Sequence, residues 1–568
     1  MKKLMQWAIA AALICSSTVF TGCSKSDDNQ EPVVKPEQPD DNGANSSSDD
    51  IGYIECSWNG TEVVKTSKVT TARDMSTLSY SSGSVRNTIK ISGFYFISGS
   101  FTTDNYLYVD GWAAIILCDG ADLKVSGIYV NNGGTLIIYA QEKGTGHLYA
   151  ETKYSDDFCP AIGTYVGDGG KVEIHGGNVD AKGGIRSAGI GGGGSDDEHA
   201  NLSDIIIYGG RVYGHSNGGA GIGAGAYDTS VKTNITIYDG LIEGSGGTDI
   251  YKGKFYGVGI GGGHKASFGS VNIYGGTVTA SASDESAGIG AGEEAPNGEG
   301  VVNIYGGTVT AQGGARGAGI GGGDGRRLNE INIHGGEVYA YAGADGAGIG
   351  GGEDGDSGDI NIYGGIVRAY GDRWADGSSN KGYGAGIGSG QNGNVNTIII
   401  KGGDVQAYGG MDAAGIGTGE EYGSDINSGT IEIHGGKVWA EGKGYGAGIG
   451  CGEDATFGVL GISGGRVDAH AGSDCGPWSG SIGAYHKDHG ADDNCHIGWA
   501  GWERIYIGAG MRLWTYSPNV GSIETVTNNL PWWNYVHQRP QAAFDVCDHP
   551  GYTEATCPFC YRETLQLQ

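Results

Sequence analysis

The C-terminal end of the sequence carries the clearest set of candidate metal ligands. Cys547 and His549 are separated by one residue, and Cys557 and Cys560 follow after a gap of seven residues. Three thiolates and one imidazole at this spacing suit a tetrahedral zinc site, and four protein ligands leave no open position for a catalytic water. Disulfide pairing of the same cysteines is the alternative, and both interpretations remain open.

Carboxylates recur four residues after the isoleucine of a repeated Gly-Ile-Gly tripeptide. The positions are Glu293, Asp324, Glu353, Glu420 and Glu453, with Gln391 between the third and the fourth. If each copy lies on one strand of a stack, these side chains form a ladder of like charges about 4.8 Å apart. A cation such as calcium could be held between them. The simpler alternative is that each carboxylate accepts hydrogen bonds from the backbone of a glycine turn.

Aromatic side chains gather at two outward positions of another repeated strand. Aligning the repeats places Tyr339, Arg368, Gln406, Trp439 and Asp468 in one column and Tyr341, Tyr370, Tyr408, Glu441 and His470 in the next. Sugar rings stack on exposed aromatic faces, while acids and amides bind sugar hydroxyls. The candidate carbohydrate-binding residues are therefore Tyr339, Tyr341, Tyr370, Tyr408 and Trp439. The alternative is that the rings only stabilise the sheet through cross-strand pairs, each contributing about 0.2–1 kcal/mol.

Two further groups of residues have a structural explanation. His175, Tyr208, Tyr238, Tyr274, Tyr305, His334, Tyr363 and His434 precede a Gly-Gly or equivalent bend in so many repeats that we expect them to stabilise the fold. The segment from Cys475 to Trp502 collects acids, histidines and tryptophans, as a catalytic or metal-binding loop would. A disulfide between Cys475 and Cys495 with a solvated rim is the alternative. No pair of carboxylates stands out for hydrolysis, so no catalytic residue is assigned.

The repeat itself predicts the fold that positions these residues. The Gly-Ile-Gly isoleucines are Ile190, Ile222, Ile260, Ile289, Ile320, Ile349, Ile387, Ile416 and Ile449, with looser relatives at Ile162 and Ile482, at gaps of 28 to 38 residues. Between copies lie two strands with period-two alternation, as in Val271 to Ala280 and Val302 to Ala311. One such unit cannot bury its apolar side chains alone, whereas stacked units bury a continuous core. The sequence therefore predicts an all-β parallel β-helix with three short strands per coil and repeats of about 31 residues.

Glycine is expected to form the corners of each coil. A Gly-Gly pair after the first strand allows positive φ and close backbone approach without a Cβ penalty. In the element Ala188 to Gly191, alternation predicts that Ala188 and Ile190 face inward while Gly189 and Gly191 face outward. The outward face of that strand would then carry few side chains, and either the adjacent loops cover it or a partner docks on it.

These repeats resemble the right-handed parallel β-helices of the pectin-lyase-like superfamily and the glycine-rich repeat proteins of gut bacterial surfaces. The resemblance covers residues 105–514, preceded by a β-rich N-terminal cap at 51–104 and followed by a small Cys/His tail at 515–568. It implies a surface protein that binds a polysaccharide or glycoprotein. A polysaccharide-cleaving lyase or glycoside hydrolase, or a structural adhesin, is the alternative on the same fold.

The N-terminus indicates export and lipid anchoring. Two lysines precede an apolar stretch from Trp7 to Phe20 that suits a signal peptide at residues 1–22. The sequence Phe20-Thr21-Gly22-Cys23 resembles a bacterial lipoprotein box, in which Cys23 is acylated, and the following acidic pair resembles the surface-export signal of Bacteroides-type lipoproteins. Residues 23–50 are too polar to fold and predict a disordered stalk. We therefore expect an outer-membrane protein, held by its lipid anchor and facing the cell exterior.

The acidic composition restricts the partners. The formal net charge is −30, from 35 basic and 65 acidic residues. Binding to nucleic acid or directly to an anionic membrane requires a basic surface, so both are excluded as partners. Neutral or cationic ligands and metal ions fit this charge. The sequence does not determine the oligomeric state.

Overall fold

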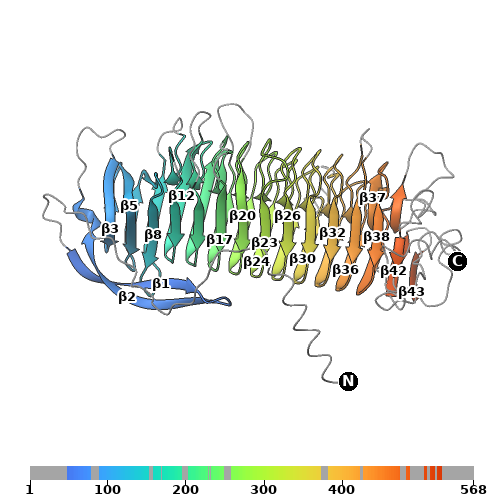
Figure 1. Cartoon of the computed structure of the whole chain (residues 1–568), viewed down its shortest axis with the longest axis horizontal. Coiled ribbons are helices and arrows are strands. Elements are labelled where there is room, and N and C mark those ends of the chain that lie inside the picture. Colours follow the sequence, from blue (N-terminus) through green and yellow to red (C-terminus); the bar gives the residue numbers. More distant parts are fainter. Residues whose placement is uncertain are drawn as a thin grey trace, which may run out of the picture. The chain divides into compact units, whose positions relative to one another are not determined.

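Successive turns of the chain stack on one another, and each full turn contributes three short strands (Figure 1). The computed structural model describes residues 48–78, 88–152, 158–167, 169–194, 202–227, 229, 232–247, 257–372, 382–421, 426–473, 481–485, 505–507, 512–517 and 521–526. From β3 (Thr88–Ile97) to β42 (Arg512–Ser517), strands of successive turns pair in parallel. The chain is a parallel β-helix, which confirms the predicted fold class.

The strands fall into three columns that run along the helix axis. The first column contains β8 (Thr135–Ala140), β11 (Lys171–Ile174), β14 (Asp204–Ile207), β17 (Thr233–Ile237), β20 (Phe268–Ile273), β23 (Val301–Ile304), β26 (Glu330–Ile333), β29 (Asp359–Ile362), β32 (Thr397–Ile400), β35 (Thr430–Ile433), β38 (Val459–Ile462) and β41 (Ile505–Ile507). The second column contains β4 (Ser100–Thr102), β6 (Asp122–Val125), β9 (His147–Glu151), β12 (Asn178–Ile185), β15 (Arg211–Asn217), β18 (Leu241–Ser245), β21 (Thr277–Ser281), β24 (Thr308–Gln312), β27 (Glu337–Tyr341), β30 (Ile366–Tyr370), β33 (Asp404–Tyr408), β36 (Lys437–Glu441), β39 (Arg466–His470) and β42. The third column contains β7 (Gly127–Tyr129), β10 (Ile162–Thr164), β13 (Ile190–Gly192), β16 (Ala220–Gly223), β19 (Val258–Gly261), β22 (Ile289–Gly290), β25 (Ile320–Gly321), β28 (Ile349–Gly350), β31 (Ile387–Gly388), β34 (Ile416–Gly417), β37 (Ile449–Glu453) and β40 (Ile482–Tyr485).

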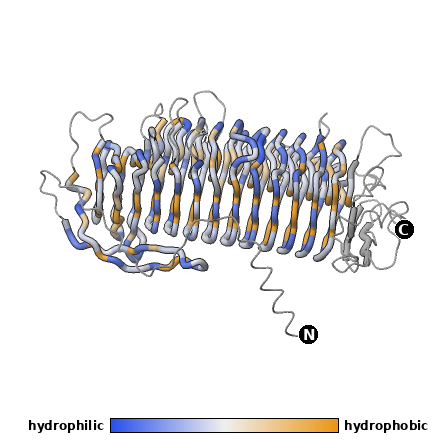
Figure 2. The backbone as a smooth tube through the Cα atoms, in the orientation of Figure 1, coloured by the Kyte–Doolittle hydropathy of each residue, from blue (hydrophilic) through white to orange (hydrophobic). Residues whose placement is uncertain are grey.

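The core is a set of apolar columns in which equivalent side chains stack. In the first column Val271 pairs with Val302 and Ile273 with Ile304, and all four side chains are buried. The Gly-Ile-Gly isoleucines are also buried, and apolar segments recur at matching places in successive turns (Figure 2). Each such side chain contributes about 1.5–3 kcal/mol by leaving water. Stacking therefore supplies the stability that one turn lacks.

The Gly-Gly pairs form the bend between the first and second strands, as predicted. The second glycine of the pair adopts a positive φ in turn after turn, for example +80° at Gly276 and +84° at Gly307. This conformation is strained for residues with a Cβ. The bend brings the outward side chains of the second strand to a face of their own.

The third column differs from the expectation that Gly189 and Gly191 face outward. Both glycines are buried. A Cβ on Gly189 would lie 2.5 Å from the backbone nitrogen of His215, and one on Gly191 would lie 1.7 Å from the carbonyl oxygen of Gly223. The Ala188 N–H donates to the Gly192 carbonyl at 2.8 Å, so the chain closes into a short loop with the isoleucine inside. The predicted outward orientation was wrong because it assumed an open strand.

The N-terminal segment forms a hairpin that runs along the side of the stack (Figure 1). Strands β1 (Ser48–Trp58) and β2 (Val63–Asp74) pair in antiparallel fashion and are followed by the 3-10 helix η1 (Met75–Thr77). The next strand, β3, pairs in parallel with β5 (Tyr106–Leu117). Parallel stacking therefore begins inside the 51–104 segment that the sequence assigned to a cap.

The described C-terminal end leaves the parallel pattern. Strand β42 pairs in parallel with β39 on one side and in antiparallel fashion with β43 (Gly521–Val526) on the other. Among the described residues, no helix is long and apolar enough to span a membrane.

Candidate functional site

The two predicted outward columns exist in the second column of strands. Strand pairing aligns Tyr339, Arg368, Gln406, Trp439 and Asp468, and it aligns Tyr341, Tyr370, Tyr408, Glu441 and His470. The side chains that alternate with them, such as Ala340 and Ala369, are buried in the core. The backbone pleat therefore holds the candidate residues on the outside of the helix.

Three tyrosines of the second outward column form a parallel stack. The ring centroids of Tyr341 and Tyr370 lie 5.0 Å apart with 4° between the planes, and those of Tyr370 and Tyr408 lie 5.1 Å apart with 5° between the planes. Parallel rings in contact are separated by about 3.5–4.0 Å along their normal, so centroids 5 Å apart mean that the rings are offset. Each ring therefore leaves part of its face uncovered.

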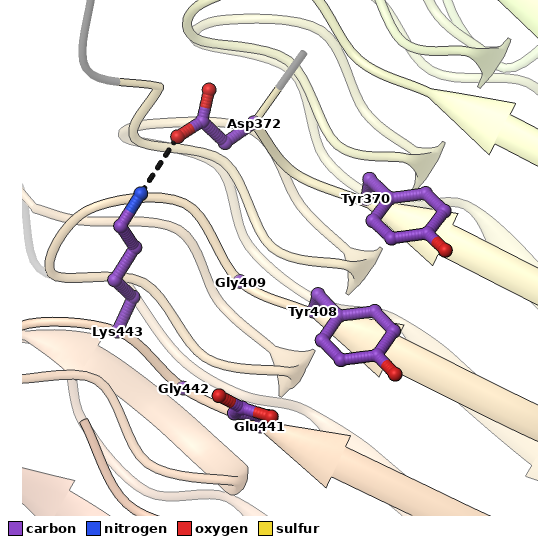
Figure 3. A pocket seen from close by; sticks show the side chains of 7 residues that line it. All are labelled: Tyr370, Asp372, Tyr408, Gly409, Glu441, Gly442 and Lys443. Atoms are coloured by element: carbon purple, nitrogen blue, oxygen red, sulfur yellow. Dashed lines mark hydrogen bonds and ion pairs between the residues drawn. The ribbon is translucent and has the colours of Figure 1, made fainter. Parts of the chain in front are cut away.

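A cavity opens beside the end of this tyrosine stack (Figure 3). Its volume is about 330 Å³, and it is lined by Tyr370, Asp372, Tyr408, Gly409, Glu441, Gly442 and Lys443. Asp372 and Lys443 form an ion pair at 2.8 Å that joins two loops lying two turns apart. The Glu441 side chain is exposed, at the position where the turns before it carry a tyrosine. Aromatic rings, two carboxylates and an ammonium group therefore meet at one open cavity.

Trp439 lies next to this cavity but does not line it. Its ring stacks on His470 with centroids 3.9 Å apart, and its indole N–H donates to Glu441 Oε2 at 3.2 Å. Trp439 therefore orients the Glu441 carboxylate, while one of its own faces is occupied. Of the five predicted carbohydrate-binding residues, Tyr370 and Tyr408 line the cavity, Tyr341 stacks on Tyr370, Trp439 contacts Glu441, and Tyr339 is not brought to the cavity.

Asp324 and Glu453, two of the recurring carboxylates, lie where the segment after one Gly-Ile-Gly copy meets the segment before the copy of the preceding turn. The backbone N–H of Asp324 donates to the Glu285 carbonyl at 2.9 Å, and that of Glu453 donates to the Asp412 carbonyl at 2.7 Å. Two groups of three carboxylates have oxygen atoms within 4.8 Å of one another: Glu285, Glu293 and Asp324, and Asp412, Glu420 and Glu453. Oxygen ligands at this separation are those that a cation such as calcium uses.

An arginine lies between carboxylates of two successive turns. Arg316 Nε lies 2.9 Å from Glu353 Oε2, and Arg316 Nη1 lies 3.3 Å from Asp324 Oδ2. Burial nevertheless raises the pKa of Glu353 to about 7 and that of Asp345 to about 6, because desolvation outweighs the attraction to Arg316. These carboxylates keep protons at a pH where exposed carboxylates have lost them.

An aromatic ladder at the end of the first column is partly covered by the hairpin. Rings from Tyr139 to Tyr363 stack with centroids 4.6–5.1 Å apart. Tyr53 contacts Tyr139 at 4.5 Å, and Trp58 stacks on Tyr238 at 4.9 Å. The ladder was predicted to stabilise the fold. Its covered part does so by packing the hairpin against the stacked turns.

Two residues that line the cavity could not be found from the sequence. Asp372 and Lys443 lie in loops whose lengths vary from turn to turn, so no repeat aligns them. Their one shared feature in the sequence is that each follows the end of an aligned strand by two residues. Cys23, the Cys475–Cys495 pair, and the predicted zinc ligands Cys547, His549, Cys557 and Cys560 lie outside the described residues, so these assignments stay predictions.

The comparison with known families agrees with the geometry. A family model for the Beta helix repeat matches residues 172–194, 271–293, 302–324, 331–353, 360–391, 398–420 and 431–453. Each match begins in a first-column strand and ends four residues after the isoleucine of the third-column strand, so it contains strands of all three columns of its turn. No curated protein and no solved structure matches the chain. The chain is a β-helix protein, and the seven matched segments are similar to the repeats of this family.

Proposed function

We propose that this β-helix protein binds a polysaccharide or a glycoprotein glycan through the outward face of its second column of strands. The observation that carries the proposal is the cavity beside the offset rings of Tyr370 and Tyr408. An uncovered aromatic face accepts the apolar face of a sugar ring, and the Glu441 carboxylate and Lys443 ammonium group can bind hydroxyls at its edge. The cavity is open, so one unit of a longer chain can enter it.

The charge of the protein limits the glycans that fit. The formal net charge is −30, and the cavity is lined by two carboxylates, Asp372 and Glu441, against one ammonium group, Lys443. Asp372 already pairs with that ammonium group. An anionic polymer would approach a surface of its own sign, so neutral glycans are the expected ligands.

The test uses a soluble fragment that starts near Asp50 and a panel of immobilised neutral and uronate polysaccharides. We expect retention on a neutral polymer, and loss of that retention in Tyr408→Ala. Tyr149→Ala is the matched control, because Tyr149 is also a partly buried outward tyrosine of the second column, in β9, distant in sequence from the cavity. Retention that survives Tyr408→Ala, or falls equally in both variants, would contradict the proposal.

Polysaccharide cleavage is the second candidate, and the carboxyl groups to test for it are Glu353 and Asp345, whose pKa values burial raises to about 7 and about 6. A carboxyl group that holds its proton near neutral pH can act as a general acid at a glycosidic bond. The same polysaccharide panel is therefore assayed for released reducing ends and unsaturated products. If cleavage product is released and disappears in Glu353→Gln, the function is cleavage and not binding. If the protein is retained on a polysaccharide without releasing product, binding or a structural adhesin role remains the function.

We also propose that the protein is displayed on the outer membrane by a lipid on Cys23. The support is the sequence of the N-terminal segment: a basic start, an apolar stretch and a small residue before the cysteine. An outward-facing anchor would place the open face of the helix where extracellular glycans are available.

A further inference from the structure

The aromatic ladder of the first column contains the same Tyr-His-Tyr unit twice. In the first unit, the His175 ring lies between Tyr139 and Tyr208, with centroids 4.6 and 4.7 Å away. In the second unit, the His334 ring lies between Tyr305 and Tyr363, with centroids 4.7 and 4.6 Å away. The two units differ in what covers them.

The first unit holds strand β1 of the hairpin. The Tyr53 ring contacts Tyr139, and the backbone N–H of Cys56 donates to His175 Nδ1 at 2.9 Å. His175 therefore accepts a main-chain hydrogen bond through an unprotonated nitrogen. An extended strand is bound here by a ring contact and a main-chain donor to an imidazole, together with a hydrogen bond from the Cys56 thiol to the His175 carbonyl at 3.2 Å and an antiparallel pairing of Ile54 with Ala140. Tyr139 and His175 are both buried as a result.

The second unit begins where the hairpin ends. Trp58, the last residue of β1, lies against Tyr238 and Tyr274, and the next ring of the ladder is Tyr305. Tyr305 is 40% exposed and Tyr363 is 39% exposed. The second unit is thus continuous with a surface that already binds a strand, but the hairpin is too short to cover it.

His334 has the chemistry that His175 uses to bind the strand. Partial burial between two rings lowers the pKa of His334, so the imidazole is neutral at neutral pH and one nitrogen can accept a hydrogen bond. Among the described residues, the His334 ring has stacking partners but no hydrogen-bond partner. His434, further along the same column, differs because its ring nitrogens already lie 2.7 Å from Ser463 Oγ and 2.8 Å from Glu432 Oε2.

We propose that Tyr305, His334 and Tyr363 form a second docking site for an extended polypeptide strand, supplied by a partner protein and carrying an aromatic side chain. The main-chain N–H of the strand donates to His334, and its aromatic side chain packs against the exposed edges of the tyrosine rings, whose faces are covered by Tyr274, His334 and Lys401. The unit is only three turns long, so it presents much less area than the roughly 800 Å² per partner of a standard protein interface. A single strand fits this surface, whereas the face of a second globular copy does not.

The probe is a fluorescent peptide with the sequence of residues 51–60 and serine in place of Cys56, because this segment carries the features that the first unit binds. It is titrated into the soluble protein starting near Asp50, and binding is followed by fluorescence anisotropy. We expect His334→Ala to weaken binding roughly tenfold, since it removes both the acceptor and a stacking ring. His334→Phe keeps the ring and should weaken binding several-fold. His434→Ala should leave binding unchanged.

Three results would overturn the proposal. The first is that the peptide does not bind to the protein without substitutions, although this protein is folded and shows a normal unfolding transition. The second is binding that His175→Ala removes and His334→Ala does not, because the peptide would then have replaced the hairpin. The third is retention of a glycan, but not of the peptide, that depends on Tyr305 or Tyr363, which would make this surface a second carbohydrate site. None of these results bears on Tyr408, so the glycan-binding proposal is tested separately.

Discussion

Replacing Gly350 by alanine tests the construction of the third column most directly. Gly350 is the second glycine of its Gly-Ile-Gly copy and has a φ of +137°. An alanine Cβ at this position would lie 1.7 Å from the carbonyl oxygen of Gly388 in the next turn. That oxygen accepts the hydrogen bond from the Gly351 N–H at 3.0 Å. The substitution therefore strains the backbone and displaces an acceptor that joins two turns.

The expected cost of Gly350→Ala follows from these two effects. A non-glycine residue in a sparsely populated backbone region costs about 1–3 kcal/mol. Leaving a buried backbone group without its partner costs a further 1–3 kcal/mol or so. We therefore expect the free energy of unfolding to fall by about 2–6 kcal/mol. Gly325→Ala is the control, because Gly325 also has a positive φ, +64°, but nothing lies within 4 Å of its added Cβ. It should cost only about 1 kcal/mol.

The measurement is urea denaturation of the soluble fragment, followed by far-ultraviolet circular dichroism. Repeat proteins can lose cooperativity, so the slope of the transition must be compared before midpoints are converted to free energies. Hydrogen exchange then shows whether the damage is local to the turns that contain Gly350 and Gly388. If Gly350→Ala and Gly325→Ala had the same midpoint, the close approach of successive Gly-Ile-Gly loops would be refuted.

Three other predictions concern charge, anchoring and metal binding. Burial raises the pKa of Glu353 from 4.5 to about 7, although Arg316 opposes the rise, so the contribution of Glu353 is most favourable below pH 4.5 and is lost as the pH rises through 7. Glu353→Gln should flatten the pH dependence of the unfolding midpoint over this range, and an unchanged profile would contradict the assignment. Cys23→Ser should abolish labelling by radioactive palmitate and release the protein from the membrane fraction, whereas labelling that persists would exclude this anchor. The full chain should retain a zinc ion that His549→Ala releases, measured by atomic absorption; disulfides among the tail cysteines, detected by mass spectrometry, would argue for the alternative.

The fold was predictable because the repeat fixes both the core and the corners. Ile289 and Ile320 recur at matching positions, and pairing places them side by side in the core. The Gly-Gly bends could be predicted from the tolerance of glycine for positive φ alone. The orientation of Gly189 was mispredicted because period-two alternation describes an open strand. The hydrogen bond from the Ala188 N–H to the Gly192 carbonyl, which closes the loop, cannot be predicted from the alternation of side chains along the sequence.

The candidate site was only partly predictable, because it combines repeated and unrepeated residues. Tyr370 and Tyr408 were found because they occupy equivalent positions of aligned strands. Asp372 and Lys443 are 71 residues apart and come together only because the two turns that carry them stack with one turn between them. The hairpin was missed for a related reason. A β-rich segment was predicted at residues 51–104, but its docking along the ladder depends on contacts such as Trp58 with Tyr238, more than 150 residues away in sequence.

The contrast between the two ring columns indicates where function resides in a repeat fold. The buried columns of side chains already hold the turns together, so an outward position can carry any side chain that fits between its neighbours in the adjacent turns. The ladder from Tyr139 to Tyr363 continues over many turns, and its covered part serves the hairpin. The tyrosine stack of the second column spans only three turns, begins after Gln312 and ends at Glu441, where the cavity opens. A stack that served only stability would gain from a ring at position 441 as well. The carboxylate there, held by the Trp439 N–H, therefore argues for a ligand beside Tyr408.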